Sequence, residues 1–418
     1  MKFAGLALLL CFGSAEMLLA QRQSWFIPPK DTDSEITTDL AAHYVALNQS
    51  AAPKNQLFLH FPGTAVTPSA QQQLANTAAD LGFHVISLNY PNDQAVNDLC
   101  GGQNTDLDCY AKVRLEIIDG IDRTPLLNIT RPNSIENRLI KLLAHLPSRA
   151  PNAGWAQFLE NDSTIIWSSI IVSGHSQGGG HAGIIGRYHR VARVIMFAAM
   201  DYNGPERKPA NWIAVPDSTP NATPAERFYG FSHQRDGLVN FAILSALIWP
   251  AYGMNAFGPV VNVDTAARPY SNTHSLTSNL NSPTNNYHGC VAGDRHLALQ
   301  PDGTPVYKPV WEYLLSNTVV SVKEEKAQSP SSFLLDQNYP NPFNPSTTIR
   351  FSLPNRERVT LKVFDVLGRE VATLVDHEVL TAGHHARSWE ANNATSGVYF
   401  YRLVAGDFQE TRKMILTR

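Results

Sequence analysis

Short apolar runs alternate with amphipathic segments over the first three quarters of the chain. Runs rich in β-branched and aromatic residues are typical of buried strands, and apolar residues at helical spacing follow them. The predicted strands cover residues 57–61, 85–90, 170–172, 193–197 and 227–231. The predicted helices cover residues 74–81, 135–146 (with Ser134 as N-cap) and 306–315. This alternation predicts an α/β fold, a doubly wound and mostly parallel sheet with helices on both faces.

The pattern changes after a polar, proline-containing stretch at residues 321–332, which is typical of a linker. Beyond it, about six short alternating runs are separated by turn signals such as Leu367-Gly368 and Ser396-Gly397. They predict a small all-β, immunoglobulin-like antiparallel sandwich over residues 333–418. This domain contains no catalytic constellation, so we expect a binding or sorting module. The larger domain then covers residues 21–320.

The first twenty residues resemble a secretory signal peptide. Lys2 supplies a positive charge, residues 4–12 are apolar, and small residues follow. We expect cleavage after Ala15 or Ala20, and no lipidation of Cys11, because Leu10 stands where a small residue is needed. No other segment has the length and apolarity of a transmembrane helix.

Cysteine content and charge narrow the chemistry. In an exported protein Cys100 and Cys109, which flank a polar loop, should form a local disulfide. Cys290 is expected to be a small buried residue. No Cys/His cluster has metal-ligand spacing, so we expect no metal and no cofactor. A net charge of −3 over 418 residues without a basic run argues against nucleic-acid binding.

The run Gly-His-Ser-Gln-Gly at residues 174–178 directly follows the apolar strand at 170–172. A glycine on each side of a serine, between a strand and a helix, is the pattern of a nucleophile elbow. It makes Ser176 the candidate nucleophile. The further glycines at 179 and 180 are expected to allow close packing of the helix on the sheet.

A serine hydroxyl needs a histidine to take its proton and a carboxylate to orient that histidine. In this arrangement the acid follows the serine along the chain, each residue lying after a strand. Asp236 follows the strand ending at residue 231 and is the first candidate for the acid. Asp201 is the runner-up, and Asp217, in a proline-rich loop, is less favoured.

His288 is the first candidate for the base. It lies after the acid and before the last predicted helix, and Gly289 beside it allows a tight turn. His274 and His296 remain competitors, whereas His175 is expected to form part of the pocket wall.

The oxyanion of an acyl-transfer intermediate needs two backbone N–H donors. One is expected from Gln177, the residue after the nucleophile. The other is expected from the loop after the first long strand, with Thr64 preferred and Gly63 possible. Pro62 has no N–H to donate.

Residues 53–315 resemble the α/β-hydrolase superfamily. The Pro-Gly-Thr-Ala segment at 62–65 and the elbow look like those of bacterial lipases, cutinases and polyesterases. The resemblance implies hydrolysis of a carboxylic ester with an apolar part, possibly polymeric, through an acyl-enzyme and without a cofactor. Long connections before the elbow and between Asp236 and His288 are expected to wall the pocket. Aromatic residues in and near them suit an apolar group: Trp155, Trp167, Trp212, Trp249 and Tyr252.

The last eighty or so residues resemble the type A C-terminal sorting domain of the type IX secretion system. The resemblance is carried by residues 337–351, 365–371 and 396–403 and by the basic end at 413–418. It implies export across both membranes of a Gram-negative cell by that machinery. The protein is then secreted or stays on the cell surface, with the sorting domain removed or kept.

Two other interpretations remain open. A peptidase or an acyltransferase uses the same three residue types. A cell-surface binding protein could use the same scaffold without catalysis, although the presence of serine, acid and histidine candidates favours an enzyme.

Overall fold

The computed structural model describes residues 22–101, 104–161, 163–203, 207–214, 222–316, 332–338, 341–380, 383–392 and 394–417. The predicted signal peptide lies outside these residues, as does the predicted linker except for Ser332. The chain divides into two compact units after Ser316. Each unit is considered separately.

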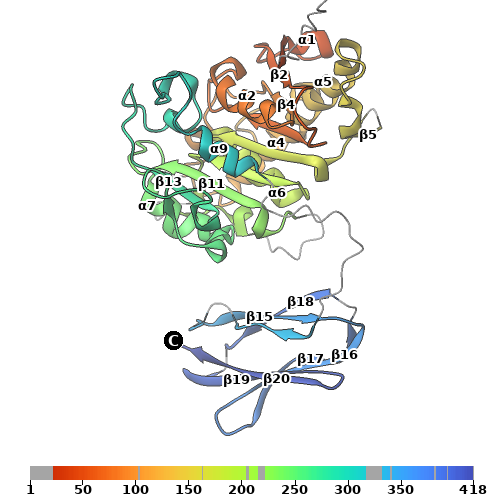
Figure 1. Cartoon of the computed structure of the whole chain (residues 1–418), viewed down its shortest axis with the longest axis vertical. Helices are drawn as coiled ribbons and strands as arrows, with labels where there is room; N and C mark the ends of the chain where they lie inside the picture. The colour runs from red at the N-terminus through yellow and green to blue at the C-terminus, as the bar shows by residue number, and fades with distance from the viewer. Residues whose placement is uncertain are drawn as a thin grey trace, which may run out of the picture. The chain divides into compact units, whose positions relative to one another are not determined.

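The first unit is built on a large, mostly parallel sheet, as the sequence pattern predicts (Figure 1). Among the described residues its strand order is β1-β2-β4-β3-β7-β8-β11-β13-β12. Only the pairings of β1 with β2 and of β2 with β4 are antiparallel. The strands are β1 (Gln23–Ile27), β2 (His43–Leu47), β3 (Leu57–Phe61), β4 (His84–Ser87), β7 (Ile170–His175), β8 (Arg193–Phe197), β11 (Phe228–His233), β12 (Val261–Asn262) and β13 (Ser275–Ser278). Two small hairpins pair β5 (Leu159–Asn161) with β6 (Thr164–Ile165) and β9 (Tyr202–Asn203) with β10 (Lys208–Pro209).

Helices cover both faces of this sheet, and strands β2, β3, β4, β7, β8 and β11 bury one face in each of two apolar clusters. Residues of α4, α5 and α6 belong to one cluster, and residues of α2 and α9 belong to the other. The helices are α1 (Pro29–Thr32), α2 (Gln72–Asp80), α3 (Val96–Cys100), α4 (Cys109–Asp119), α5 (Ile135–Arg149), α6 (Gln177–Tyr188), α7 (Phe241–Ile243), α8 (Trp249–Ala251) and α9 (Lys308–Leu315). As expected, Ser134 caps α5 by accepting a hydrogen bond from the Asn137 N–H.

The strand predicted at residues 85–90 leaves the sheet earlier than its apolar pattern suggests, at Ser87. Asn89 and Tyr90, which follow the strand, are buried too, but they are held by hydrogen bonds to or from side chains and not by strand pairing. The Asn89 N–H donates to His43 Nδ1 (3.0 Å), and Tyr90 Oη donates to the Pro62 carbonyl (2.7 Å). An apolar pattern alone does not distinguish these two ways of burying a chain.

The second unit contains two antiparallel sheets, ordered β14-β15-β18 and β17-β16-β19-β20 (Figure 1). Alternate residues of their strands share one apolar core, which includes Phe351, Leu361 and Tyr401. The strands are β14 (Leu334–Leu335), β15 (Ser346–Leu353), β16 (Glu357–Phe364), β17 (Glu370–Leu380), β18 (Gly383–Glu390), β19 (Gly397–Ala405) and β20 (Phe408–Leu416).

The parallel strands at the centre of the large sheet end at a common edge. Phe61 of β3 lies beside Gly174 of β7, and His175 lies beside Phe197 of β8. Phe197 in turn lies beside Phe231 of β11. The loops that follow these strands therefore converge, and a ligand site in an open parallel sheet forms at this edge.

Three of the buried histidines of this unit are held by uncharged hydrogen-bond partners. His60 bonds Ser173 Oγ and Gln71 Oε1, His43 Nδ1 accepts the Asn89 N–H, and His274 Nδ1 bonds the Phe228 carbonyl. Burial lowers the pKa of His43 to about 3 and the pKa of His60 and of His274 to about 4. These rings therefore stay uncharged in the folded protein well below the ordinary histidine pKa.

We predict that acidification from pH 6.5 to pH 4.5 destabilises the first unit. Over this range the unfolded chain binds protons on these three histidines and the folded protein does not, so the free energy of unfolding falls with pH. Burial raises the pKa of Asp294 to about 6, so over this range the folded protein binds a proton there that the unfolded chain does not. This uptake offsets the effect of one histidine. The expected slope is on the order of 1–3 kcal/mol per pH unit. Denaturant unfolding followed by tryptophan fluorescence measures it, since every tryptophan except Trp389 lies in this unit. Stability that stays constant or rises over this range would contradict the prediction.

Candidate active site

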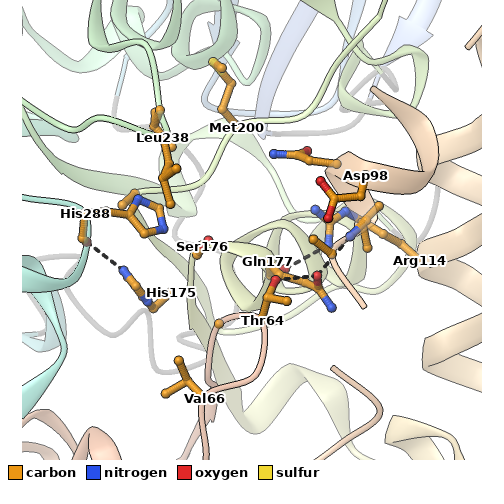
Figure 2. Close-up of a pocket in the computed structure, with 16 residues that line it drawn as sticks. Thr64, Val66, Asp98, Arg114, His175, Ser176, Gln177, Met200, Leu238 and His288 are labelled. Carbon is orange, nitrogen blue, oxygen red and sulfur yellow. Dashed lines mark hydrogen bonds between the residues drawn. The ribbon is translucent and has the colours of Figure 1, made fainter. Parts of the chain in front are cut away.

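Ser176 lies at the tip of a sharp turn between β7 and α6 (Figure 2). Its backbone has φ 53° and ψ −120°, a conformation that costs a non-glycine residue about 1–3 kcal/mol. The Ser176 N–H donates to the Phe197 carbonyl (2.8 Å), which ties the turn to β8. The strained turn presents the hydroxyl at the N-terminus of α6, where the helix dipole favours negative charge.

The glycines on each side of Ser176 are required by close backbone contacts. A Cβ on Gly174 would lie 2.1 Å from the carbonyl carbon of Gly178. A Cβ on Gly178 would lie 2.0 Å from the Phe61 carbonyl oxygen. The first turn of α6 is thus packed directly against the chain that leaves β3, with no space for a side chain.

Asp236 and His288 are joined by a hydrogen bond. His288 Nδ1 lies 2.8 Å from Asp236 Oδ2 and 3.0 Å from Oδ1. The carboxylate, whose side chain is fully buried, also accepts the N–H groups of Leu238 (2.8 Å) and Val239 (2.9 Å). Burial raises the pKa of Asp236, but the bonds from His288 and the two amides outweigh it, and the pKa lies below the ordinary value.

The other ring nitrogen of His288 faces the cavity that Ser176 lines (Figure 2). This Nε2 is buried and has no hydrogen-bond partner among the described residues. The structure therefore brings Ser176, His288 and Asp236 together, with one imidazole nitrogen held by the carboxylate and the other available.

The competing candidates from the sequence lie elsewhere or have other partners. Asp201 forms a buried ion pair with Arg114, with distances of 2.5 and 2.6 Å. His274 is stacked between Tyr229 and Phe257. His296 Nδ1 bonds Thr284 Oγ1 (2.7 Å), and Asp217 lies outside the described residues.

His175, expected in the pocket wall, lines the cavity and also contacts the candidate base. Its Nε2 donates to the His288 carbonyl (2.8 Å), and the two rings lie 4.8 Å apart between centroids. Burial, together with the neighbouring His288 ring, lowers the pKa of His175 to about 3. His175 is therefore neutral near pH 7 and supports the backbone of His288 without adding charge.

Thr64 and Gln177, the expected oxyanion donors, lie side by side at the cavity (Figure 2). Thr64 Oγ1 donates to Gln177 Oε1 (2.8 Å) and links the two residues. Their backbone N–H groups donate to no acceptor in the described part of the chain. The carbonyl of Gly63, the alternative donor, is held by Asn92 Nδ2 (2.7 Å), which fixes the loop.

The cavity has a volume of about 330 Å³ and two walls of different character. Met200, Leu238 and Val239 make an apolar wall near His288, and Leu238 is 74% exposed at the mouth. None of the five aromatic residues that the sequence offered either for the pocket or for the core lines this cavity. Trp155, Trp212, Trp249 and Tyr252 are buried in the core beside the sheet, and Trp167 packs on His189 at the surface. A tryptophan in a long connection has the same pattern whether it fills a core or a pocket.

The opposite wall is polar and comes from α3 and α4. Asn97, Asp98 and Arg114 line the cavity there. Arg114 Nη1 also donates to the Gln177 carbonyl (2.8 Å). These residues belong to the long connection before the elbow, which was expected to wall the pocket, but the sequence analysis did not single them out. The one signal was Gly180, where a Cβ would lie 2.1 Å from Arg114 Nη2, so this glycine admits the arginine and does not serve helix–sheet packing.

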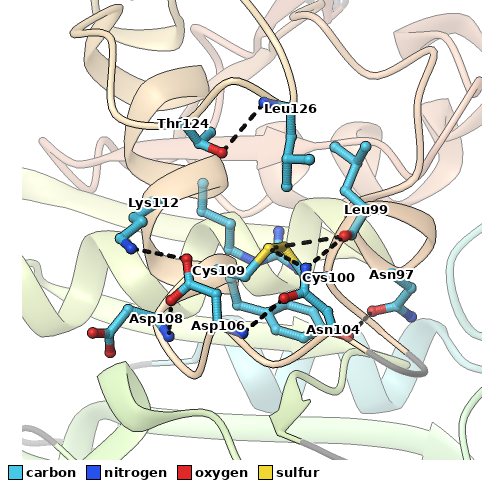
Figure 3. The surroundings of a disulfide bond; sticks show 12 residues. Asn97, Leu99, Cys100, Asn104, Asp106, Asp108, Cys109, Lys112, Thr124 and Leu126 are labelled. Atoms are coloured by element: carbon cyan, nitrogen blue, oxygen red, sulfur yellow. Dashed lines mark hydrogen bonds and ion pairs between the residues drawn. A yellow bond between two sulfur atoms is a disulfide. The ribbon is translucent and has the colours of Figure 1, made fainter.

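A disulfide between Cys100 and Cys109, the pairing that the sequence predicts, joins α3 to α4 (Figure 3). The short connection between them is also bonded locally: Asn104 Nδ2 donates to the Leu99 carbonyl (3.0 Å), and Lys112 pairs with Asp106 (2.8 Å). At the other end of α3, the Val96 N–H donates to Gln177 Oε1 (3.0 Å). The polar wall is thus fixed both to the elbow and to α4.

Cys290 is buried and unpaired, as expected. Its Sγ donates to the Tyr287 carbonyl (3.3 Å), and burial raises its thiol pKa to about 12. A thiol that stays protonated in this way is a packing residue and not a nucleophile.

Comparison with known proteins identifies the second unit. Residues 337–417 match the family of secretion system C-terminal sorting domains. The protein is therefore one that is secreted or displayed at the surface of a Bacteroidetes-type Gram-negative cell, as the sequence predicted. Among the described residues no helix has the length and apolar character needed to cross a bilayer.

No curated protein matches the sequence. One similar solved structure is the crystal structure of TT1662 from Thermus thermophilus, at 11% identity and a TM-score of 0.30. The match covers 62% of this chain and 89% of that protein.

We predict that Gly178→Ala destabilises the protein, although alanine has a higher helix propensity than glycine. The added methyl group would collide with the Phe61 carbonyl, and such overpacking costs at least about 1–3 kcal/mol. Gly237→Ala is the matched control, because its Cβ meets nothing within 4 Å. Denaturant unfolding of both variants measures the difference. A Gly178→Ala protein as stable as the control would show that the elbow is not packed as described.

We also predict that replacing Cys100 and Cys109 together by alanine lowers the free energy of unfolding by about 2–3 kcal/mol, because a short covalent loop is lost from the unfolded chain. Adding a thiol reductant to the wild-type protein should reproduce this loss. The double variant is the control, since its stability should not respond to reductant. Equal sensitivity of the two proteins would show that the effect arises elsewhere.

Proposed function

We propose that the first unit is a serine hydrolase of the α/β-hydrolase type that cleaves carboxylic esters through an acyl-enzyme on Ser176. The observation that carries the proposal is the state of His288. Asp236 holds one of its ring nitrogens, and the other is buried and partnerless in the cavity lined by Ser176. An imidazole held in this way is suited to accept a proton from the serine hydroxyl.

In the first half of the reaction, His288 Nε2 takes the proton of Ser176 Oγ as the oxygen attacks the ester carbonyl carbon. A tetrahedral intermediate forms, and its negative charge develops on the former carbonyl oxygen. Asp236, with its lowered pKa, stays ionised and stabilises the imidazolium. His288 then gives the proton to the leaving alcohol oxygen, the ester C–O bond breaks, and Ser176 carries the acyl group.

The oxyanion would be bound by the backbone N–H groups of Thr64 and Gln177. Both donors are available, and both are held in place: Thr64 through its hydroxyl bond to Gln177, and Gln177 through Arg114 and Val96. Donors that are fixed before the reaction need no reorganisation when charge develops. Support of this kind is typical of acyl-transfer sites.

In the second half, a water molecule occupies the place of the alcohol and gives a proton to His288 while it attacks the acyl carbon. The same oxyanion donors bind the second intermediate. Collapse of that intermediate releases the carboxylic acid and returns the proton to Ser176. Neutral His175 behind the base adds no positive charge that would oppose formation of the imidazolium.

The apolar wall of Met200, Leu238 and Val239 favours an ester with an apolar part. The sorting domain sends the protein out of the cell, where lipids and polyesters are available substrates of this kind. Peptide hydrolysis and acyl transfer to another acceptor use the same groups, so the assay includes them as outcomes.

We predict that Ser176→Ala and His288→Ala each lower kcat for a short-chain p-nitrophenyl ester by at least about a thousandfold, because each removes a group that acts in the same step. Asp236→Asn should lower kcat by up to about ten-thousandfold, since the wrong histidine tautomer is then favoured. A fluorophosphonate probe should label the wild-type protein and not the serine variant.

His274→Ala and His296→Ala, compared per folded protein, are the controls for the identity of the base. Both should keep most of the activity. Wild-type activity in Ser176→Ala would refute the proposal. Hydrolysis of peptides with no turnover of esters would refute the substrate class and leave the three residues in place. A stable, folded protein that neither reacts with the probe nor turns over any substrate would favour a binding protein.

A further inference from the structure

The polar wall of the cavity carries one charged side chain that has no partner among the described residues. Asp98 projects from α3 on the side of the cavity away from His288 (Figure 2), and Asn97 of the same helix also lines the cavity. Asn97 Oδ1 accepts a hydrogen bond from Tyr110 Oη (2.9 Å). Asp98 is exposed to solvent, and in the described part of the chain its carboxylate has neither a hydrogen-bond donor nor a cation beside it.

The only other charged side chain on that wall, Arg114, is already paired. Its Nε and Nη2 bond the two carboxylate oxygens of Asp201, and both side chains are almost fully buried. Its remaining nitrogen, Nη1, is used by the Gln177 carbonyl. The positive charge of Arg114 is thus neutralised where it stands, and the solvent-exposed Asp98 is the unpaired charged side chain that remains on this wall.

The helix that carries Asp98 cannot easily withdraw from the cavity. Its first residue, Val96, is bonded to the Gln177 side chain, and its last, Cys100, is bonded covalently to α4. A group that fills a cavity of about 330 Å³ next to Ser176 therefore meets this wall.

The tetrahedral carbon on Ser176 has three other substituents, and the site assigns a direction to each. The leaving oxygen must lie near His288, which protonates it. The oxyanion must lie near Thr64 and Gln177. The acyl chain takes the direction that remains, into the part of the cavity between Met200 and α3 (Figure 2). Asp98 then stands at the far end of the acyl chain.

We propose that Asp98 is a specificity-determining residue for the acyl group, an inference that rests on the function proposed above. It selects acyl chains that are uncharged at their far end, accepts a hydrogen bond where that end carries a hydroxyl group, and rejects chains that end in a carboxylate. A like charge placed against an unpaired carboxylate is repelled, and this discriminates between substrates without any change in the reacting groups.

The test compares three p-nitrophenyl esters that share a leaving group and a six-carbon acyl chain: the hexanoate, the 6-hydroxyhexanoate and the monoester of adipic acid. The wild-type protein should prefer the hexanoate to the adipate monoester by at least tenfold in kcat/KM, after spontaneous hydrolysis is subtracted. The 6-hydroxyhexanoate should be turned over at least as well as the hexanoate. Added salt should narrow the ratio of hexanoate to adipate monoester.

Asp98→Asn keeps the shape of the side chain and removes its charge. It should reduce the ratio about tenfold, mainly by raising kcat/KM for the adipate monoester, and should remove the salt dependence of the ratio. Asp122→Asn is the matched control: Asp122 is exposed and does not line the cavity, and its variant should keep the wild-type ratio.

The outcomes separate the two proposals. An unchanged ratio in Asp98→Asn, or a wild-type preference for the adipate monoester, would overturn the role of Asp98 and leave the ester hydrolase standing. A preference for the monoester would point to Arg114 as the dominant charge. No hydrolysis of any of the three esters by a folded wild-type protein would overturn the proposed function itself, and the role of Asp98 with it.

Discussion

The candidate site depends on how closely the first turn of α6 approaches the chain that leaves β3. Gly178 meets the Phe61 carbonyl, and only a residue without a side chain allows that distance. This contact brings Thr64, on the loop after β3, beside Gln177, at the start of α6, and the two side chains are joined by a hydrogen bond. A methyl group would push the loop away and separate them. The strained conformation of Ser176 is maintained by the same packing, together with the bond from its N–H to Phe197.

A buried ion pair holds the other side of the elbow. Arg114 and Asp201 are both removed from water, and two such charges are stable only when each is fully paired. Removing one partner would leave the other buried and unpaired, which is more costly than losing the bond itself. The guanidinium of Arg114, which projects from α4, bonds both Asp201, in the loop after β8, and the Gln177 carbonyl. Gly180 leaves room for it. The pair therefore helps to fix the position of Gln177 as well as to stabilise the fold.

The features that could be predicted from the sequence are those that local pattern encodes. Each buried strand of the parallel sheet, the serine turn and the local disulfide is defined by residues that lie within about ten positions of one another. The order of serine, acid and histidine led to Asp236 and His288, and the structure brings these two together. Arg114 and Asp201 are 87 residues apart, and no local pattern relates them. The edge strand β1 has only a short apolar run and is largely exposed, and the sequence did not predict it or its neighbour β2. The sequence also left open whether the tryptophans fill the core or line the pocket, because both places suit the same residue type.

The disulfide between α3 and α4 makes completion of the pocket depend on the compartment in which the protein is located. Thiols stay reduced in the cytosol, and disulfides form only in oxidising compartments. A chain that carries a sorting domain reaches such a compartment after synthesis. The wall that holds Asp98 is therefore completed late, outside the compartment in which the chain is made. Inside the cell the same polypeptide has a pocket with one looser side, so maturation of the site and export of the protein become parts of one process.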